Sequence, residues 1–303
     1  MSYKTINLQC GRWIEIELPN QSDLEYLRNE FSFIHPTNLE DAFQRVPRAK
    51  VDINENYVFL SVAVPTKIAQ GRKATNFELS LFLMNDALVT ITHERTDIFK
   101  QEQKEAEEIA SVTLPENPQI LAYRFLEILY ELSSKAIEKI NTSIGHIDDH
   151  ILDVTSKAII RDISVLQRNI IYFMTTTHAS IPIFEELEHK NVGFGATPMK
   201  EFWGDLVDKL KQQRDVLEDY DTMLSKLAKA HETYLGFHTN NVIHILTVVS
   251  VIFMPLNLVA GIYGMNFEII PTLEHPLGFY GALLTMLLIS VSLIAYFRHK
   301  KWM

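Results

Sequence analysis

Five polar side chains recur at helical spacing in an otherwise apolar segment near the C-terminus. They are Asn240, His244, Thr247, Ser250 and Asn257, and at 100° per residue they fall within about 140° of arc. If such a segment crosses a membrane, its polar side chains face protein or water rather than lipid. Hydrogen bonding between helices and the lining of a water-filled pore both fit this pattern, and the spacing alone leaves both open.

The loop that follows this segment contains Gly264, Met265 and Asn266. Gly264 permits a tight chain reversal and a close approach of the backbone. The amide oxygen of Asn266 is a neutral acceptor that can hold a hydrated cation through its water molecules, and Mg²⁺ gives up its water reluctantly. One loop would bind too weakly, but a ring of loops from several chains could form a selectivity filter. The loop therefore favours the pore interpretation.

Two apolar segments are long enough to cross a membrane. They run from 242 to 262 and from 277 to 297, and about 21 residues of helix span roughly 30 Å, the thickness of the hydrocarbon core. The net charge of −10 and a mean hydropathy near zero conceal them, because a long polar part precedes them. The acidic balance gives no indication of nucleic-acid binding.

The charged flanks predict the orientation in the membrane. Arg298, Lys300 and Lys301 follow the second segment, whereas the loop 263–276 has no Lys or Arg and carries Glu268 and Glu274. The positive-inside rule then places the loop outside and both termini in the cytoplasm. The first residues carry no apolar run, so we expect no cleaved signal peptide. These features predict a multi-pass protein of the cell (inner) membrane.

The N-terminal part predicts a mixed α/β domain over residues 1–96. Ser22 is the expected N-cap of a helix at 22–31, with Glu25 three residues later, and a second helix is expected at 38–44. Six segments have the β-branched and aromatic enrichment of strands: 4–8, 13–18, 51–53, 57–64, 77–83 and 87–92.

Helices follow this domain. We expect a charged helix at 97–111, then long helices from 119 to about 157 and from 159 to about 190. Thr197 caps and Pro198 opens a last helix that continues to 259, about 60 residues and roughly 90 Å long. A helix of that length needs neighbours along its whole length, which argues for a bundle made by several copies of the chain.

Other motifs give no sign of an enzyme. The single Cys10 excludes an intramolecular disulfide and Cys-rich metal sites. Gly193 and Gly195 lack the third glycine of a nucleotide loop. His231 and His238 have no histidine or cysteine partner four residues on, so no zinc site is evident. The pair His93 and Glu94 has no third catalytic partner, and no nucleophile–base pair is recognisable.

Several runs resemble the CorA family of divalent-cation channels. In the C-terminal part they are Phe253-Met254-Pro255-Leu256, Ala260-Gly261-Ile262-Tyr263-Gly264-Met265-Asn266-Phe267 and the basic ending 296–303. In the N-terminal part they are Ile34-His35-Pro36, Leu39-Glu40-Asp41, Pro47-Arg48-x-Lys50-Val51 and Glu55-Asn56-Tyr57-Val58-Phe59. The resemblance covers the whole chain.

The resemblance implies a funnel-shaped homopentamer: an α+β cytoplasmic domain, long helices and a C-terminal hairpin of two transmembrane helices. The expected parts are 1–96, 97–190, the stalk 197–241, the pore helix 242–262, the loop 263–276, the outer helix 277–297 and the tail 298–303. The expected selectivity filter is Gly264, Met265 and Asn266. The implied pore-lining residues are Asn240, Ile243, Leu246, Thr247, Ser250, Met254 and Asn257, whose apolar members would form the closed gate.

The resemblance also implies regulatory Mg²⁺ sites between neighbouring cytoplasmic domains. Glu40 and Asp41 match one side of such a site, and Asp205 with Asp208 one turn later matches the other. Carboxylates suit a hard cation, which would bridge two subunits and relieve their repulsion. Without the resemblance, the same residues read as a solvated helix face and the acidic first turns of a helix.

Two residues of the first span depart from the family pattern, and the helix leaves open which of two residues before it faces the pore. Asn257 stands where many members have Thr. His244 stands where Lys or Arg is common, and with an ordinary pKa of about 6.5 it would add pH sensitivity or serve only as an interfacial packing residue. Asn240 and Asn241 are about 100° apart, and either could face the pore.

The expected transported ion is Mg²⁺, with Co²⁺ and Ni²⁺ as further candidates. Zinc-transporting relatives usually replace the loop methionine, and Met265 is retained here. The alternative function is a Zn²⁺ transporter of the same fold, whose flux would follow a pH gradient if it is coupled to protons. A membrane-anchored scaffold is a third candidate, but it would need neither the polar face nor the Gly-Met-Asn loop.

Overall fold

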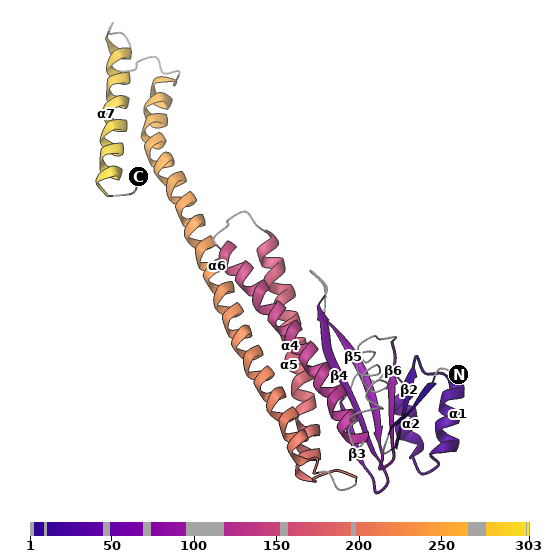
Figure 1. Cartoon of the computed structure of the whole chain (residues 1–303). Helices are drawn as coiled ribbons and strands as arrows, with labels where there is room; N and C mark the ends of the chain where they lie inside the picture. Colours follow the sequence, from indigo (N-terminus) through magenta and orange to yellow (C-terminus); the bar gives the residue numbers. More distant parts are fainter. Residues whose placement is uncertain are drawn as a thin grey trace. The chain divides into compact units, whose positions relative to one another are not determined.

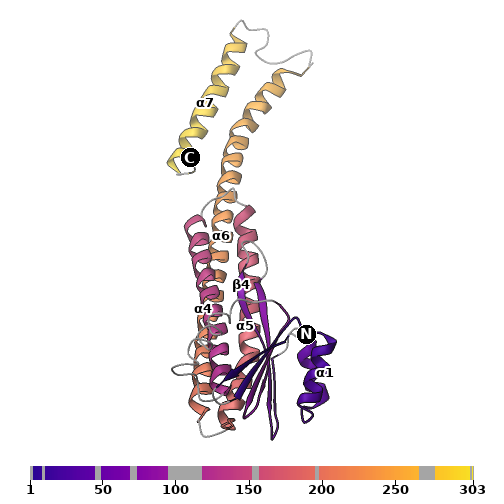
Figure 2. The same ribbon diagram turned by 45° about the vertical axis from the view of Figure 1, so that its right-hand side comes forward.

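The computed structural model describes residues 3–8, 11–44, 49–68, 74–94, 118–151, 157–194, 198–265, 277–300 and 302. The chain forms two compact units, residues 1–228 and 229–303, whose elements appear in Figures 1 and 2. The helix expected at 97–111 lies outside the described residues.

A six-stranded mixed sheet forms the centre of the first unit. All six predicted strands are present, and the order β1-β2-β6-β5-β4-β3 contains a single parallel pair, β2 with β6. β4 and β5 extend beyond their predicted bounds and form the longest ladder. The strands are β1 (Tyr3–Leu8), β2 (Gly11–Glu17), β3 (Lys50–Ile53), β4 (Val58–Ile68), β5 (Ala74–Leu83) and β6 (Ala87–Thr92).

Helices cover both faces of this sheet. Alternate residues of one strand enter different cores, because side chains of a strand point to opposite faces: Leu81 belongs to one core and Phe82 to the other. The first core is closed by α4 (Pro118–His150), α5 (Lys157–His189) and the start of α6 (Lys200–Tyr263). The second is closed by α1 (Gln21–Glu30) and α2 (Pro36–Phe43), and Figures 1 and 2 show the two groups on opposite sides.

The first helix begins earlier than predicted. Asn20, and not Ser22, is the N-cap of α1, and its Oδ1 accepts hydrogen bonds from the backbone N–H of Ser22 at 2.9 Å and of Asp23 at 3.1 Å. The Asp23 carboxylate in turn accepts from the N–H of Asn20 at 3.1 Å, which completes a capping box. The prediction was wrong because Asn20 and Ser22 are both good caps, and only the backbone geometry selects between them.

The long helices pack against one another beyond the sheet. Ile140 and Ile144 of α4, Phe173 of α5, and Leu217 and Leu224 of α6 share a third buried core. α4 ends at His150 and not near residue 157 as predicted. The predicted long final helix is confirmed as α6, with 64 residues, although it begins at Lys200, and the expected cap Thr197 lies outside the described residues.

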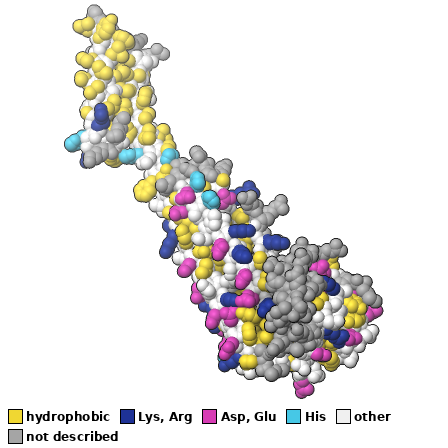
Figure 3. All heavy atoms as spheres, in the orientation of Figure 1, with side chains coloured by type: hydrophobic (Ala, Val, Ile, Leu, Met, Phe, Trp, Pro, Cys, Tyr) yellow, Lys and Arg dark blue, Asp and Glu magenta, His cyan; other side chains and the backbone are white. Residues whose placement is uncertain are grey.

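The second unit contains the C-terminal part of α6 and α7 (Gly278–His299). In the described part of the chain, these two helices are long and apolar enough to cross a membrane. Their side chains are mostly exposed and hydrophobic, as the yellow surface in Figure 3 shows. Exposed apolar surface of this extent is typical of a segment that lipid covers.

Candidate functional site: the free face of α6 and the paired carboxylates

The membrane part of α6 has one partly buried stripe. Its members recur every three or four residues, as one face of a helix requires: His244, Val248, Ile252, Pro255, Leu256, Val259 and Tyr263. A matching stripe of small and apolar residues follows α7: Gly278, Ala282, Met286, Ile289, Ser290, Leu293 and Phe297. The two stripes are the faces along which the helices of the hairpin pack together.

The residues predicted to line a pore all lie outside that stripe. Each of the seven is exposed in the chain, with Leu246 at 65% and Met254 at 73%. At 100° per residue, their mean direction lies roughly 160° from that of the partly buried stripe. The face of α6 opposite α7 therefore carries Asn240, Ile243, Leu246, Thr247, Ser250, Met254 and Asn257. Their role as a pore lining remains a prediction.

Two hydroxyl groups on this free face bond back to the helix. Thr247 Oγ1 donates to the carbonyl of Ile243 at 2.8 Å, and Ser250 Oγ donates to the carbonyl of Leu246 at 2.8 Å. The hydrogen of each hydroxyl is thus bonded to a backbone carbonyl oxygen. The oxygen lone pairs remain as acceptors that can face water or the water shell of a cation.

His244 lies on the packed side of α6 and not among the polar residues of the free face. Its ring centre is 4.4 Å from that of Trp302. Trp302 also stacks on Phe297 at 5.8 Å and donates its backbone N–H to the Phe297 carbonyl at 2.9 Å. This contact fits the interpretation of His244 as an interfacial packing residue. His244 is therefore not counted among the polar residues of the free face.

The expected filter begins at the end of α6. The Gly264 N–H donates to the Ala260 carbonyl at 3.0 Å, so Gly264 still follows the helical pattern. A β-carbon at this position would lie 3.2 Å from the Ala260 oxygen, a tight approach that favours glycine. Met265 is 52% exposed, and Asn266 lies outside the described residues.

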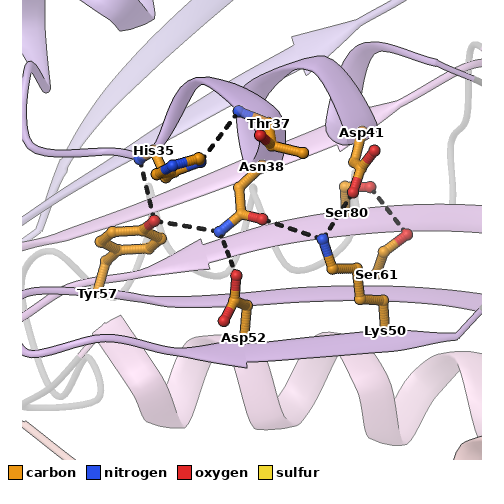
Figure 4. Close-up of polar contacts among 9 residues, drawn as sticks. All are labelled: His35, Thr37, Asn38, Asp41, Lys50, Asp52, Tyr57, Ser61 and Ser80. Carbon is orange, nitrogen blue, oxygen red and sulfur yellow. Dashed lines mark hydrogen bonds and ion pairs between the residues drawn. The ribbon is translucent and has the colours of Figure 1, made fainter.

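The α2 half of the expected regulatory site is held by a polar network over β3 (Figure 4). Asp41 Oδ2 accepts from Lys50 Nζ at 2.7 Å, and Lys50 also donates to Asn38 Oδ1 at 3.1 Å. Asn38 is 1% exposed, and its amide donates to Asp52 at 2.8 Å and to the Tyr57 hydroxyl at 3.1 Å. This network fixes the helix that carries Asp41 and the exposed Glu40.

The α6 half is held by a second network. Asp205 Oδ2 accepts from the Tyr123 hydroxyl at 2.7 Å and pairs with Lys209 Nζ at 2.9 Å. Lys209 also donates to Glu127 Oε1 at 2.5 Å. Asp208, one turn away from this network, is exposed.

The networks shift the pKa values of their members. Burial alone would raise the pKa of Asp205, but the hydrogen bonds from Tyr123 and Lys209 hold it below its ordinary value. Burial, together with the hydrogen bond to Asp205, raises the pKa of Tyr123. Burial opposes the charge of Lys209, yet the hydrogen bonds to Glu127 and Asp205 raise its pKa. All three groups keep their ordinary charge at neutral pH.

The two expected halves do not meet within one chain. Leu39 of α2 belongs to the core on one face of the sheet, and Leu206 of α6 belongs to the core on the other. Among the described residues, no group of three or more His, Cys, Asp or Glu side chains is arranged to hold a metal ion. Glu40 and Asp41 could therefore meet Asp205 and Asp208 only across two chains.

Sequence reasoning missed the lysines and Glu127 in these networks. Lys209 is four residues after Asp205, a spacing that could have suggested the ion pair. The contact of Lys209 with Glu127 joins residues 82 positions apart, and no spacing rule along the sequence predicts it.

Comparison with known proteins shows which family this chain resembles. Residues 9–300 match the model of the CorA-like Mg²⁺ transporter protein family. The chain is 27% identical over 291 residues to the cobalt/magnesium transport protein CorA of Thermotoga maritima, covering 96% of this chain and 83% of that protein.

Solved structures share the fold. The complete structure of the CorA magnesium transporter from Methanocaldococcus jannaschii superposes with a TM-score of 0.85 at 20% identity, over 98% of this chain and 94% of that one. A ZntB cytoplasmic domain from Vibrio parahaemolyticus matches less well, with a TM-score of 0.60 at 9% identity, over 75% of this chain and 88% of that one.

The family match covers nearly the whole chain, including both candidate membrane helices. Members of this family are transporters of divalent cations and not enzymes, which agrees with the polar face on a candidate membrane helix. The chain therefore belongs to the CorA-like Mg²⁺ transporter family.

Proposed function

We propose that this chain forms a Mg²⁺ channel in the inner membrane, as a homopentamer whose α6 helices line a central pore, with both termini in the cytoplasm. The observation that carries the proposal is the free face of α6. Seven residues of mixed polar and apolar type lie opposite the stripe that packs on α7. Polar side chains on such a face need water or protein next to them.

The free face supplies the parts that conduction needs. Rings of Thr247, Ser250 and Asn257 would offer oxygen acceptors to a hydrated cation. Rings of Leu246 and Met254 would form apolar constrictions that lose water and block ions in the closed state. A membrane potential of 100 mV drives a doubly charged ion inward with about 4.6 kcal/mol, so the proposed channel needs no chemical energy source.

Selection would occur at the loop. A ring of Gly264, Met265 and Asn266 presents neutral oxygens, which suit an ion that keeps its inner water molecules. Mg²⁺ is the expected ion, with Co²⁺ and Ni²⁺ as further ones. The alternative is a Zn²⁺ transporter of the same fold, which the weaker ZntB likeness supports less well.

Gating would come from the cytoplasmic domain. Glu40 and Asp41 of one subunit would face Asp205 and Asp208 of the next, and Mg²⁺ bound between them would neutralise their mutual repulsion. When cytoplasmic Mg²⁺ falls, the ion leaves, the carboxylates repel, and the subunits separate enough to open the pore.

The test is ion flux into liposomes that contain the purified protein and a Mg²⁺-sensitive dye. A potassium–valinomycin potential is applied without a pH gradient, and Asn266→Ala is compared with Asn54→Ala, a control that removes an exposed amide from the turn before β4. We expect potential-driven Mg²⁺ entry that Asn266→Ala abolishes and Asn54→Ala preserves. Zn²⁺ entry only under a pH gradient would support the alternative, and no flux of either ion would support the scaffold.

A further inference from the structure

Each half of the proposed regulatory site already holds a cation from its own chain. Lys50 Nζ lies 2.7 Å from Asp41 Oδ2, and Lys209 Nζ lies 2.9 Å from Asp205 Oδ2. Lys50 comes from β3 and Lys209 from α6, and their carboxylate partners lie on α2 and α6, which cover opposite faces of the sheet. The same kind of pairing therefore occurs independently at both halves.

The α6 half is the more fully built of the two. Lys209 Nζ contacts both Glu127 Oε1 and Asp205 Oδ2, and Tyr123 Oη lies within hydrogen-bond distance of the same two oxygens, with its one hydrogen donated over the shorter contact to Asp205. The four contacts, at 3.1, 2.7, 2.5 and 2.9 Å, close a ring between α4 and α6. The ammonium group of Lys209 thus lies between two carboxylates, the position that a small free cation would otherwise take.

These ion pairs are open to exchange. The side chains of Lys209, Glu127 and Asp205 are 34%, 30% and 45% exposed, and those of Lys50 and Asp41 are 39% and 32% exposed. A lysine side chain is flexible and strongly hydrated at its tip. Either ammonium group can therefore swing into water while its carboxylate turns toward another cation.

We propose that Lys50 and Lys209 are tethered competitors for the divalent cation, and that they set the cytoplasmic Mg²⁺ concentration at which the channel closes. The proposal rests on the proposed function, because it assigns regulation to the same carboxylates. A Mg²⁺ ion that bridges two subunits through Asp41 and Asp205 would compete with Lys50 and Lys209 for the charge of these carboxylates. When the ion leaves, the ammonium groups return and cancel part of the repulsion.

The competition predicts the direction and size of the effect. Without a lysine, its carboxylate is free to bind Mg²⁺ and no like charge repels the ion, so the apparent affinity rises. A partly exposed ion pair changes an equilibrium by a factor of about 1.5 to 5. Each lysine should therefore raise the half-saturating Mg²⁺ concentration by about that factor, and removing both should lower that concentration more than removing either one.

The experiment uses the full-length protein in detergent and measures the Mg²⁺ concentration that gives half-maximal protection from chymotrypsin. Chymotrypsin cleaves after aromatic and large apolar residues, so replacing Lys by Gln neither adds nor removes a cleavage site. The variants are Lys209→Gln, Lys50→Gln and the double variant. Lys229→Gln is the matched control, because Lys229 lies further along the same helix and pairs with Glu232 at 2.7 Å, and neither residue is an expected ligand. Asp205→Asn tests the underlying site.

We expect Lys209→Gln and Lys50→Gln each to lower the half-protecting concentration about 1.5- to 5-fold, the double variant to lower it further, and Lys229→Gln to leave it unchanged. Lys209→Arg keeps the charge and should behave like the wild type. If Asp205→Asn raises the concentration while the lysine variants leave it unchanged, the competition is overturned and the regulatory site stands. If Asp205→Asn changes nothing, the proposed site fails and the competition with it, whereas liposome flux tests the channel itself.

Discussion

Asn38 shows how one buried residue positions a candidate ligand. Its side chain is 1% exposed, and it joins α2 to Asp52 and Lys50 of β3 and to the Tyr57 hydroxyl before β4. A buried amide with three partners holds its helix in one orientation, because any rotation would leave polar groups unpaired. The direction in which Asp41 points therefore depends on a neighbouring side chain that binds no ion.

Asn38→Leu should destabilise the first unit by about 1–3 kcal/mol, because it leaves the polar partners of the amide unpaired in a buried place. Urea unfolding of the full-length protein in detergent measures the loss through tryptophan fluorescence, since Trp13 and Trp203 are buried in that unit at 0% and 1% exposure. The exposed Asn54→Ala serves as the control. Equal midpoints for the two variants would contradict the role given to Asn38.

At the scale of the element, α6 is a single helix with two different environments. Its first turns supply Leu206 and Leu210 to the core against the sheet, whereas its last turns expose apolar side chains suited to lipid. Within the second unit, α7 covers one side of α6 and leaves the polar side free. We therefore expect Mg²⁺ flux to be sensitive to apolar substitutions on the polar face of α6 and much less sensitive to them on α7.

Thr247 and Thr285 provide a matched pair for this prediction. Both are exposed, and each hydroxyl donates to the carbonyl four residues earlier, at 2.8 Å for Thr247 on α6 and 2.9 Å for Thr285 on α7. Thr247→Leu should lower Mg²⁺ flux roughly tenfold or more, because added apolar bulk in a narrow pore favours loss of water. Thr285→Leu should leave flux within about twofold of the wild type, since α7 would face lipid and its partner helix.

Liposome flux under a fixed potential measures both variants at equal protein content. Similar loss of flux in both would show that the hairpin, and not the pore, is sensitive to the substitution. Unchanged flux in Thr247→Leu would remove this face of α6 from the conduction path.

At the scale of the whole molecule, the sheet separates the expected ligands. Glu40 and Asp41 lie on the α2 side, and Asp205 and Asp208 lie on the α6 side. A layer of β-sheet between two helical layers places such groups too far apart for one small ion. The proposed regulatory site therefore requires an interface in which the α2 side of one chain meets the α6 side of another.

Such an interface is head-to-tail and closes into a ring only at a fixed subunit number. In a Cys10→Ser background, which removes the single native cysteine, the pair Asp41→Cys and Asp208→Cys should form disulfides between chains under mild oxidation. Non-reducing electrophoresis should then show a ladder that ends at five chains.

Two controls accompany this cross-linking. Each single cysteine variant should stop at the dimer, because one thiol per chain cannot extend a ring. Asp41→Cys with Glu218→Cys places the second thiol further along α6 and should give little product. A ladder ending at another number would overturn the pentamer, and a disulfide within one chain would contradict the separation by the sheet.

The sequence by itself determined the parts of this protein whose signal is local. β-Branched and aromatic enrichment predicted all six strands, and helical spacing and the length of the apolar runs predicted the long last helix and the two candidate membrane helices, because each signal depends on residues close together in the chain. The motif around Gly264 and the runs near Asp41 carry the resemblance to the family in the sequence itself. The cap of α1 and the end of α4 were misplaced, since neighbouring residues there satisfy the same local rule equally well.

Only the tertiary structure decided which residues meet. His244 shares the spacing of the polar residues, yet its ring packs against Trp302 on the packed side of the hairpin. The lysine partners of Asp41 and Asp205, and the joining of Glu127 to Lys209 across 82 positions, follow from how strands and helices stack. Such contacts depend on three-dimensional packing between distant segments, which local pattern does not encode, and for that reason only the folded chain shows the lysine–carboxylate pairs on which the proposed competition rests.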